Sequence, residues 1–257
     1  MATYNKRGYK PEKPKVEKEE NAHQAVLNDK SDTAEVFNSL DSTANKIGTW
    51  FTLNQSKAFY AIGALAVAAV GYFVYDHFVM EPKQDVAAND MFQAQQYYEQ
   101  AVNGQAADSL YNLALNGGEG KMGFLGIISE YSGTDAANLA HYYAGTSYLN
   151  MGKFKEAIEH LEQFNSKDLF LKAMSLGAIG DAFAELNQPQ EAFEFYKKAS
   201  EHTPNDFSTP RYAYKAGLMA LELGKKDEAL KLFTNVKDNY KGSVEAANID
   251  VYLGMAQ

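Results

Sequence analysis

A glycine-rich segment, GGEGKMG, is the first place in this chain where residue types and spacing could support chemistry. Its Gly118, Gly120 and Gly123 have the spacing of the glycines that let a backbone approach a dinucleotide pyrophosphate. That fingerprint requires a strand before it and a helix after it, whereas the preceding residues DSLYNLALN have a helical pattern. Lys121 is followed by Met122 and not by Ser or Thr, so the segment is not a P-loop either. A loop between two helices is expected here.

Histidines and carboxylates are the other residues with catalytic potential. The five histidines are His23, His77, His141, His160 and His202. No two of them lie three or four positions apart, so none forms a metal-binding pair on one helix face. His141 falls at a helix-packing position, where a hydrogen-bonded core histidine is expected. Asp181 and Glu185 lie one turn apart, but without a nucleophile or base beside them they favour a solvated or binding face. We therefore predict no enzyme, no cofactor and no metal.

Three segments of the C-terminal part repeat one pattern of small and large residues, and they must position any site. In each segment a Gly precedes an Ala by twelve residues; the pairs are Gly145 with Ala157, Gly180 with Ala192, and Gly217 with Ala229. Successive Ala residues are 35 and 37 positions apart. Small residues at both positions let two paired helices cross closely, and the large residues beside them fill the groove between neighbouring pairs.

This pattern resembles the tetratricopeptide repeat, a helix–turn–helix unit of about 34 residues. The matching segments are about 138–171, 173–206 and 210–243. Residues 244–256 are expected to form a capping helix, since terminal units of such arrays are atypical. The family's frequent Trp is replaced by His141, Leu176 and Ala213, and Ala220 stands where an aromatic residue is usual. The resemblance implies an all-α solenoid over residues 81–257 that offers a binding surface and not a reaction.

The resemblance also implies which side chains line the concave groove of that solenoid. They are Tyr142, Thr146, Leu149, Met174, Asp181, Glu185, Arg211, Tyr214, Leu218 and Glu222. A mixed apolar, aromatic and acidic lining favours an extended or helical peptide that carries some positive charge. The alternative is that part of this set packs against the capping helix.

An apolar stretch, Ala58–Met80, precedes the repeats. Its first eighteen residues carry no charge and would span about 27 Å as a helix, close to the roughly 30 Å of a bilayer's hydrocarbon. We predict a single transmembrane helix over residues 57–80. The alternatives are a buried helix of a soluble domain and a cleaved signal peptide, but a long polar segment comes first. Small residues at steps of three and four predict a face for another helix, unless they recur by chance in an Ala-rich helix. They are Ala61, Ala64, Ala68 and Gly71.

The N-terminal segment has two parts. Residues 1–32 are rich in Lys and Glu and are expected to be a disordered cytoplasmic tail. Residues 33–56 are expected to form an amphipathic juxtamembrane helix, which lies on the membrane or docks a cytoplasmic partner. Its apolar residues recur at steps of three and four, at Phe37, Leu40, Ala44, Ile47 and Phe51.

Charge gives an orientation and narrows the partners. Basic residues concentrate before the apolar stretch and only Lys83 follows it closely, so the N-terminus is predicted in the cytoplasm and residues 81–257 outside. The net charge of −9 falls in residues 81–257, because acids and bases balance before them. An acidic domain without a basic patch argues against nucleic acid. The chain has no cysteine, which excludes disulfides and thiol sites.

A cytoplasmic tail, one anchor and an exported tetratricopeptide domain together resemble the YfgM type of membrane protein. The runs GFLGIISEYSGT and GTSYLNMGKFKEAIEHL carry the local resemblance. It implies a bacterial inner-membrane scaffold beside the Sec translocon, whose periplasmic domain meets secreted chains and a prolyl-isomerase-like chaperone. The first alternative is an adaptor of another envelope complex, in secretion, motility or cell-wall machinery. The second is an enzyme with an unrecognised site.

Overall fold

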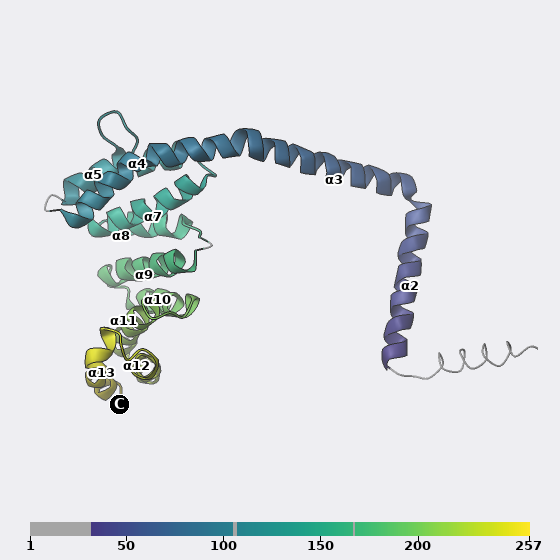
Figure 1. Cartoon of the computed structure of the whole chain (residues 1–257). Helices are drawn as coiled ribbons and strands as arrows, with labels where there is room; N and C mark the ends of the chain where they lie inside the picture. Colours follow the sequence, from purple (N-terminus) through teal and green to yellow (C-terminus); the bar gives the residue numbers. More distant parts are fainter. Residues whose placement is uncertain (1–31, 105–106, 167) are drawn as a thin grey trace, which may run out of the picture. The chain divides into compact units, whose positions relative to one another are not determined.

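The protein is helical almost throughout the part that the structure describes. This computed structural model describes residues 32–104, 107–166 and 168–257 (Figure 1). Within these ranges there is no strand, only an isolated bridge between Gly118 and Lys121. The predicted all-α fold is therefore confirmed there, whereas the predicted tail over residues 1–32 lies outside the described residues except for Asp32. The chain divides into two compact units, Met1–Phe73 and Val74–Gln257, which we describe separately.

The first unit contains helix α2, Asp32–Leu53, and most of helix α3, Gln55–Tyr75. In α2 the apolar side chains Leu40, Ile47 and Trp50 are exposed. Helix α3 begins a helical run, Gln55–Asn103, that contains a stretch long and apolar enough to cross a membrane, and only 6% of that stretch is buried. The described part of this unit thus holds no core that could cover an apolar helix.

The second unit starts with the last two residues of α3, followed by a π-helical turn, η1, Asp76–Met80, and by α4, Glu81–Asn103. Ala87, Met91 and Ala94 recur at steps of four and three and are buried against the helices that follow. These are α5, Ala107–Asn116, α6, Phe124–Glu130, and α7, Asp135–Asn150. The glycine-rich segment forms the loop between α5 and α6, and no βαβ unit surrounds it in the described residues.

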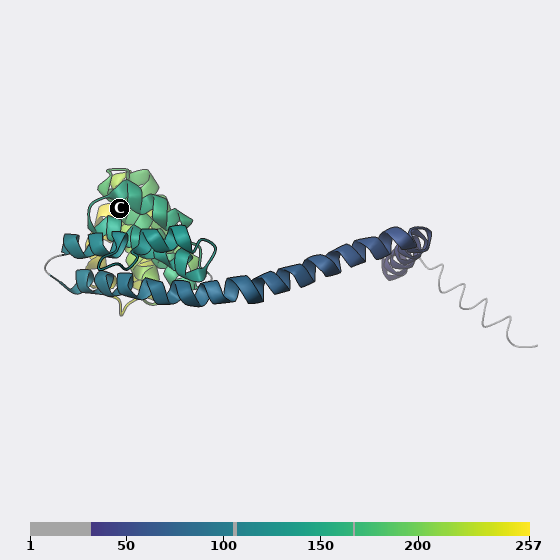
Figure 2. The ribbon, with the colours of Figure 1, turned by 90° about the horizontal axis from the view of Figure 1, so that it is seen from above.

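The rest of the unit is a stack of helix pairs. Figure 1 shows the pairs following one another, and Figure 2, seen along the stack, shows them overlapping. The pairs are α7 with α8, Phe154–Gln163; α9, Leu169–Glu185, with α10, Pro189–His202; and α11, Ser208–Glu222, with α12, Lys226–Asn239. A short 3-10 turn, η2, Glu245–Asn248, leads into α13, Ile249–Ala256, which packs on α12.

The helices of each pair cross where the sequence places its small residues. Ala157, Ala192 and Ala229 are fully buried. A Cβ added to the glycine of each pair would lie 2.4–2.6 Å from a large side chain of the second helix, so the glycine is a steric requirement. The contacts are Gly145 with Leu161, Gly180 with Tyr196, and Gly217 with Phe233. Each large residue lies sixteen positions after its glycine, so the three pairs share one packing geometry.

The turn between the two helices of a pair is also repeated. Gly152, Asn187 and Gly224 have φ values of 71°, 57° and 70° and end the first helix in the left-handed region. The next residue donates its N–H to a carbonyl five residues back at 2.8–2.9 Å, as in a Schellman motif. Asn therefore takes in the second pair the conformation that Gly takes in the other two.

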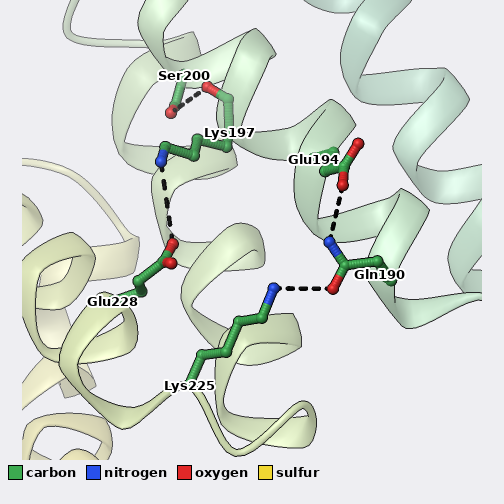
Figure 3. Close-up of polar contacts among 6 residues, drawn as sticks. All are labelled: Gln190, Glu194, Lys197, Ser200, Lys225 and Glu228. Atoms are coloured by element: carbon green, nitrogen blue, oxygen red, sulfur yellow. Dashed lines mark hydrogen bonds and ion pairs between the residues drawn. The ribbon is translucent and has the colours of Figure 1, made fainter.

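Polar contacts connect the second helices of neighbouring pairs. Figure 3 shows Lys225 pointing to Gln190 and Lys197 pointing to Glu228. The distance from Lys225 Nζ to Gln190 Oε1 is 2.8 Å, and that from Lys197 Nζ to Glu228 Oε2 is 3.9 Å. Lys225 Nζ also lies 4.8 Å from the centroid of the Phe193 ring. These partly exposed contacts add little stability each.

Candidate interaction groove

Two cavities lie along the first helices of the pairs, and six of the ten predicted groove residues line them. The first cavity, about 560 Å³, includes Leu149, Asp181 and Glu185. The second, about 390 Å³, includes Arg211, Tyr214 and Leu218. Lys215 lines both cavities, so the two adjoin and form one surface. We call this surface the groove.

A half-buried network around one carboxylate lines the first cavity. Asp181 Oδ1 accepts a hydrogen bond from the Tyr196 hydroxyl at 2.7 Å. It also forms an ion pair with Lys215, whose Nζ donates to it at 2.5 Å. Burial, and then the adjacent Asp181 charge, raise the pKa of Tyr196 well above its usual value, so its hydroxyl keeps its proton. The network connects α9, α10 and α11, because one residue comes from each. Asp181 is thus neutralised from within the protein.

The second cavity is more aromatic. Tyr214 packs edge-on against Tyr252 of α13, with ring centroids 5.1 Å apart, and both rings contact Phe233 beneath them. Burial and the hydrogen bond with Tyr252 raise the pKa of Tyr214 to about 12. Arg211 and Lys215 stand one helical turn apart at the rim. Glu245 also lines this cavity, so its side chains carry charges of both signs, and the apolar surface between them suits a segment with an aromatic or aliphatic anchor.

Sequence models of the tetratricopeptide repeat match residues 139–168, 173–206 and 212–243, which are the three helix pairs. These pairs are tetratricopeptide repeats. The expected repeat architecture is thereby confirmed, and with it a solenoid of the kind that binds proteins. A comparison with curated proteins returned no match, so no named relative refines this assignment.

The other four predicted groove residues lie elsewhere in the tetratricopeptide stack. Tyr142 packs on Phe164, with centroids 5.3 Å apart, and burial raises its pKa to about 12. Thr146 is buried and its hydroxyl donates to carbonyl oxygens of its own helix. Met174 packs on the core, and its sulfur accepts from the Tyr212 hydroxyl at 3.4 Å. Glu222 is exposed at the end of α11. The first two repeats therefore use part of the predicted lining for packing.

The groove residues predicted from the sequence did not include Lys215 or Tyr196, although both line the first cavity. Lys215 follows Arg211 by four residues and precedes Leu218 by three. This spacing places it on the same face of α11 as those two residues, so the sequence held a signal for it. Tyr196 is a second-helix residue, and only its contact with Gly180 brings its hydroxyl to Asp181. The sequence also showed no sign of the close contact at Gly177 between two repeats. A Cβ there would lie 2.0 Å from the Tyr212 ring of the next repeat.

The structure brings together two histidines that are far apart in sequence. Nδ1 of His141 on α7 lies 3.2 Å from Nδ1 of His160 on α8, and Tyr148 stacks on the His160 ring. Burial lowers the pKa of both imidazoles, and each lies close enough to disfavour a second proton on the pair. No group of three or more His, Cys, Asp or Glu side chains suited to a metal occurs among the described residues.

Proposed function

We propose that the protein is a membrane-anchored scaffold whose groove binds a polypeptide segment. The observation that carries this proposal is the pair of cavities that adjoin at Lys215 over three tetratricopeptide repeats. The apolar stretch of α3 supports an anchor, since its side chains are exposed in the described part of its unit.

The charges of the groove describe the segment that would bind. Asp181 is already paired with Lys215, so it offers little attraction to a cation. Glu185 and Glu222 are exposed at the ends of α9 and α11, and Arg211 stands at the second cavity. We therefore expect a peptide with an apolar anchor over Tyr214 and a basic residue near Glu185.

The finer assignment rests on the resemblance to the YfgM type. This resemblance implies that the protein lies in the inner membrane, with its N-terminus in the cytoplasm and its solenoid in the periplasm. There it serves as an ancillary subunit of the Sec translocon that engages secreted chains or a periplasmic chaperone or prolyl isomerase. The basic residues before α3 support this orientation.

Copurification from mild detergent tests this proposal. The native protein should recover translocon or chaperone subunits. The double variant Glu185→Lys with Leu218→Asp should recover several-fold less, because it reverses a charge and removes an apolar contact. Glu201→Lys, at an exposed position on α10, is the matched charge control and should bind as the native protein does. Equal recovery by the two variants would exclude the groove as the binding surface.

Crosslinking from the anchor separates the translocon from other envelope complexes. A photoreactive residue at Ala64 or Ala68 should capture a translocon membrane subunit. The same probe at Ala66, on the opposite face of α3, should capture less. Capture of subunits of a secretion, motility or cell-wall complex would favour the adaptor alternative. The groove variants leave this crosslink unchanged, so anchor contacts and groove contacts are measured independently.

A further inference from the structure

One edge of the second unit is continuous from the point where the chain enters it. Lys83 Nζ donates to the carbonyl of Ser132 at 3.2 Å, and Gln84 Oε1 accepts from the Asp135 N–H at 2.8 Å. Two hydrogen bonds therefore connect the start of α4 to the start of α7 and the residues before it. Figure 1 shows α4 and α9 starting at the same side of this unit.

The same edge continues through the next two repeats. Asn138 on α7 makes two hydrogen bonds with the backbone of Asn165, of 2.6 and 2.9 Å. Beyond it α9 begins, and the Phe170 ring at its start contacts Phe207 at the start of α11, with centroids 5.5 Å apart. The starts of α4, α7, α9 and α11 thus share one edge.

This edge carries an exposed apolar patch, formed by Leu169, Phe170 and Phe207, which are 54%, 44% and 57% exposed. The backbone beneath the patch is held firmly. Asp168 Oδ1 accepts from the N–H groups of Phe170 and Leu171 at 2.8 and 3.1 Å. Asn205 Oδ1 accepts from the N–H groups of Phe207 and Ser208 at 2.9 and 2.7 Å. These hydrogen bonds fix the backbone at both aromatic residues, whose side chains are exposed.

We propose that this patch inserts into the interfacial region of the bilayer that α3 spans. The inference rests on the proposed membrane anchor. The edge begins at Lys83 and Gln84, a few residues after the apolar stretch ends, so a membrane anchor there would tether the edge to the bilayer through a short segment. Three apolar side chains bind a bilayer weakly alone, but a tether raises their effective concentration at that surface.

Charge favours apolar insertion over headgroup attraction. Asp168 and Asp206 flank the patch and Lys172 follows Leu169 by three residues, so the charges around the patch give no net attraction to an anionic surface. Insertion should therefore occur in zwitterionic lipid and should not increase when anionic lipid is added. A polar protein partner would not need the exposed aromatic pair.

Fluorescence quenching in vesicles tests this inference. The chain has no cysteine, so single cysteines can be labelled cleanly in the full-length protein. Leu169→Cys reports on the patch, and Gln188→Cys, exposed beyond the far end of α9, is its control. The 17 residues of α9 separate the two by about 25 Å. In phosphatidylcholine vesicles, a nitroxide lipid with a shallow label should quench the patch label several-fold more than the control label.

A third label separates this inference from the proposed anchor. Ala68→Cys, within α3, should be quenched by a nitroxide deep in the acyl chains. If this label is quenched and the Leu169→Cys label is not, the anchor stands and the patch does not insert. If the Ala68→Cys label is not quenched, the anchor and the inference both fail.

Removing the aromatic rings tests the cause of insertion. In the Leu169→Cys background, Phe170→Ser with Phe207→Ser should reduce quenching several-fold, whereas Phe92→Ser, 59% exposed on α4, should not. Because these side chains are exposed, circular dichroism should show the same unfolding midpoint for each variant. Quenching that grows several-fold with phosphatidylglycerol, or a photocrosslink from position 169 to protein and not to lipid, would overturn the inference.

Discussion

Helix α3 and the tetratricopeptide helices both carry small residues on one face, but these residues lie in opposite surroundings. In the repeats, Gly145, Gly180 and Gly217 each lie against a large side chain of the paired helix. In α3, a Cβ added to Gly63 or Gly71 would meet no other atom within 4 Å, and Ala61, Ala64 and Ala68 are exposed. In the repeats, a large side chain of the same chain occupies the space beside each small residue. In α3, no side chain occupies that space in the described part of the first unit.

This difference shows what a small-residue pattern can establish. It predicts that a helix permits close approach, but the approaching residue must come from elsewhere in the sequence. In the repeats, the approaching large residue lies sixteen positions after each glycine, whereas no such residue follows the small residues of α3 in the described part of the first unit. A partner helix in the membrane would complete the α3 pattern, which is what the proposed contact face requires.

Truncating a large residue at a repeat crossing should give the largest effect. Phe233 is fully buried against Gly217, Tyr214 and Tyr252, so Phe233→Ala should lower the free energy of unfolding by about 3–5 kcal/mol. Phe73→Ala in α3, where the ring is 67% exposed, should change it by less than about 0.5 kcal/mol. Urea unfolding of both variants in one detergent, followed by circular dichroism, measures the difference. Similar losses would mean that α3 shares the core of the solenoid.

Adding one methyl group tests the same comparison from the other side. In Gly180→Ala the new Cβ would lie 2.6 Å from the Tyr196 ring, which is held by its hydrogen bond to Asp181. We expect a net loss of about 1–2 kcal/mol, because overpacking exceeds the gain in helix propensity. Gly71→Ala should leave solenoid unfolding unchanged. Stabilisation by Gly180→Ala would show that the helices do not cross as closely as described.

The sequence predicted those parts of the fold that depend on local spacing. The helix pairs followed from the Gly–Ala interval, and the all-α class followed from periodicity without strand signals. The groove was predicted less well, because its chemistry depends on contacts between repeats. Asp181 reads as a free carboxylate in sequence, and only the packing of α10 and α11 supplies Tyr196 and Lys215. The histidine pair was invisible for the same reason, since nineteen residues separate His141 from His160.

Acid should destabilise the solenoid through this histidine pair. Burial, and for His141 also the charge of His160, lowers both folded-state pKa values below the usual 6.5. As pH falls below 6.5 the unfolded chain binds protons first, so the free energy of unfolding falls until the folded pair also titrates. Unfolding compared at about pH 7.5 and about pH 5.5 should show this loss. The double variant His141→Gln with His160→Gln should lose less over the same interval, and His202→Gln, exposed on α10, should behave as the native protein. An unchanged pH dependence in the double variant would remove the pair as its cause.

The smallest expected effect separates backbone conformation from side-chain packing. Asn187 is exposed and has φ of 57°, so its side chain contributes no burial and its role is conformational. Asn187→Ala should cost about 1 kcal/mol, because an ordinary residue is strained in the left-handed region. Asn187→Gly should stay within about 0.5 kcal/mol of the native value, since Gly adopts this region freely but also gains freedom when unfolded. Thermal unfolding of the two variants beside Gly180→Ala would show whether the turn or the crossing limits the second repeat. Equal losses for the Ala and Gly variants would mean that Asn187 acts through its side chain, and the shared turn geometry of the three repeats would then not explain why Asn replaces Gly.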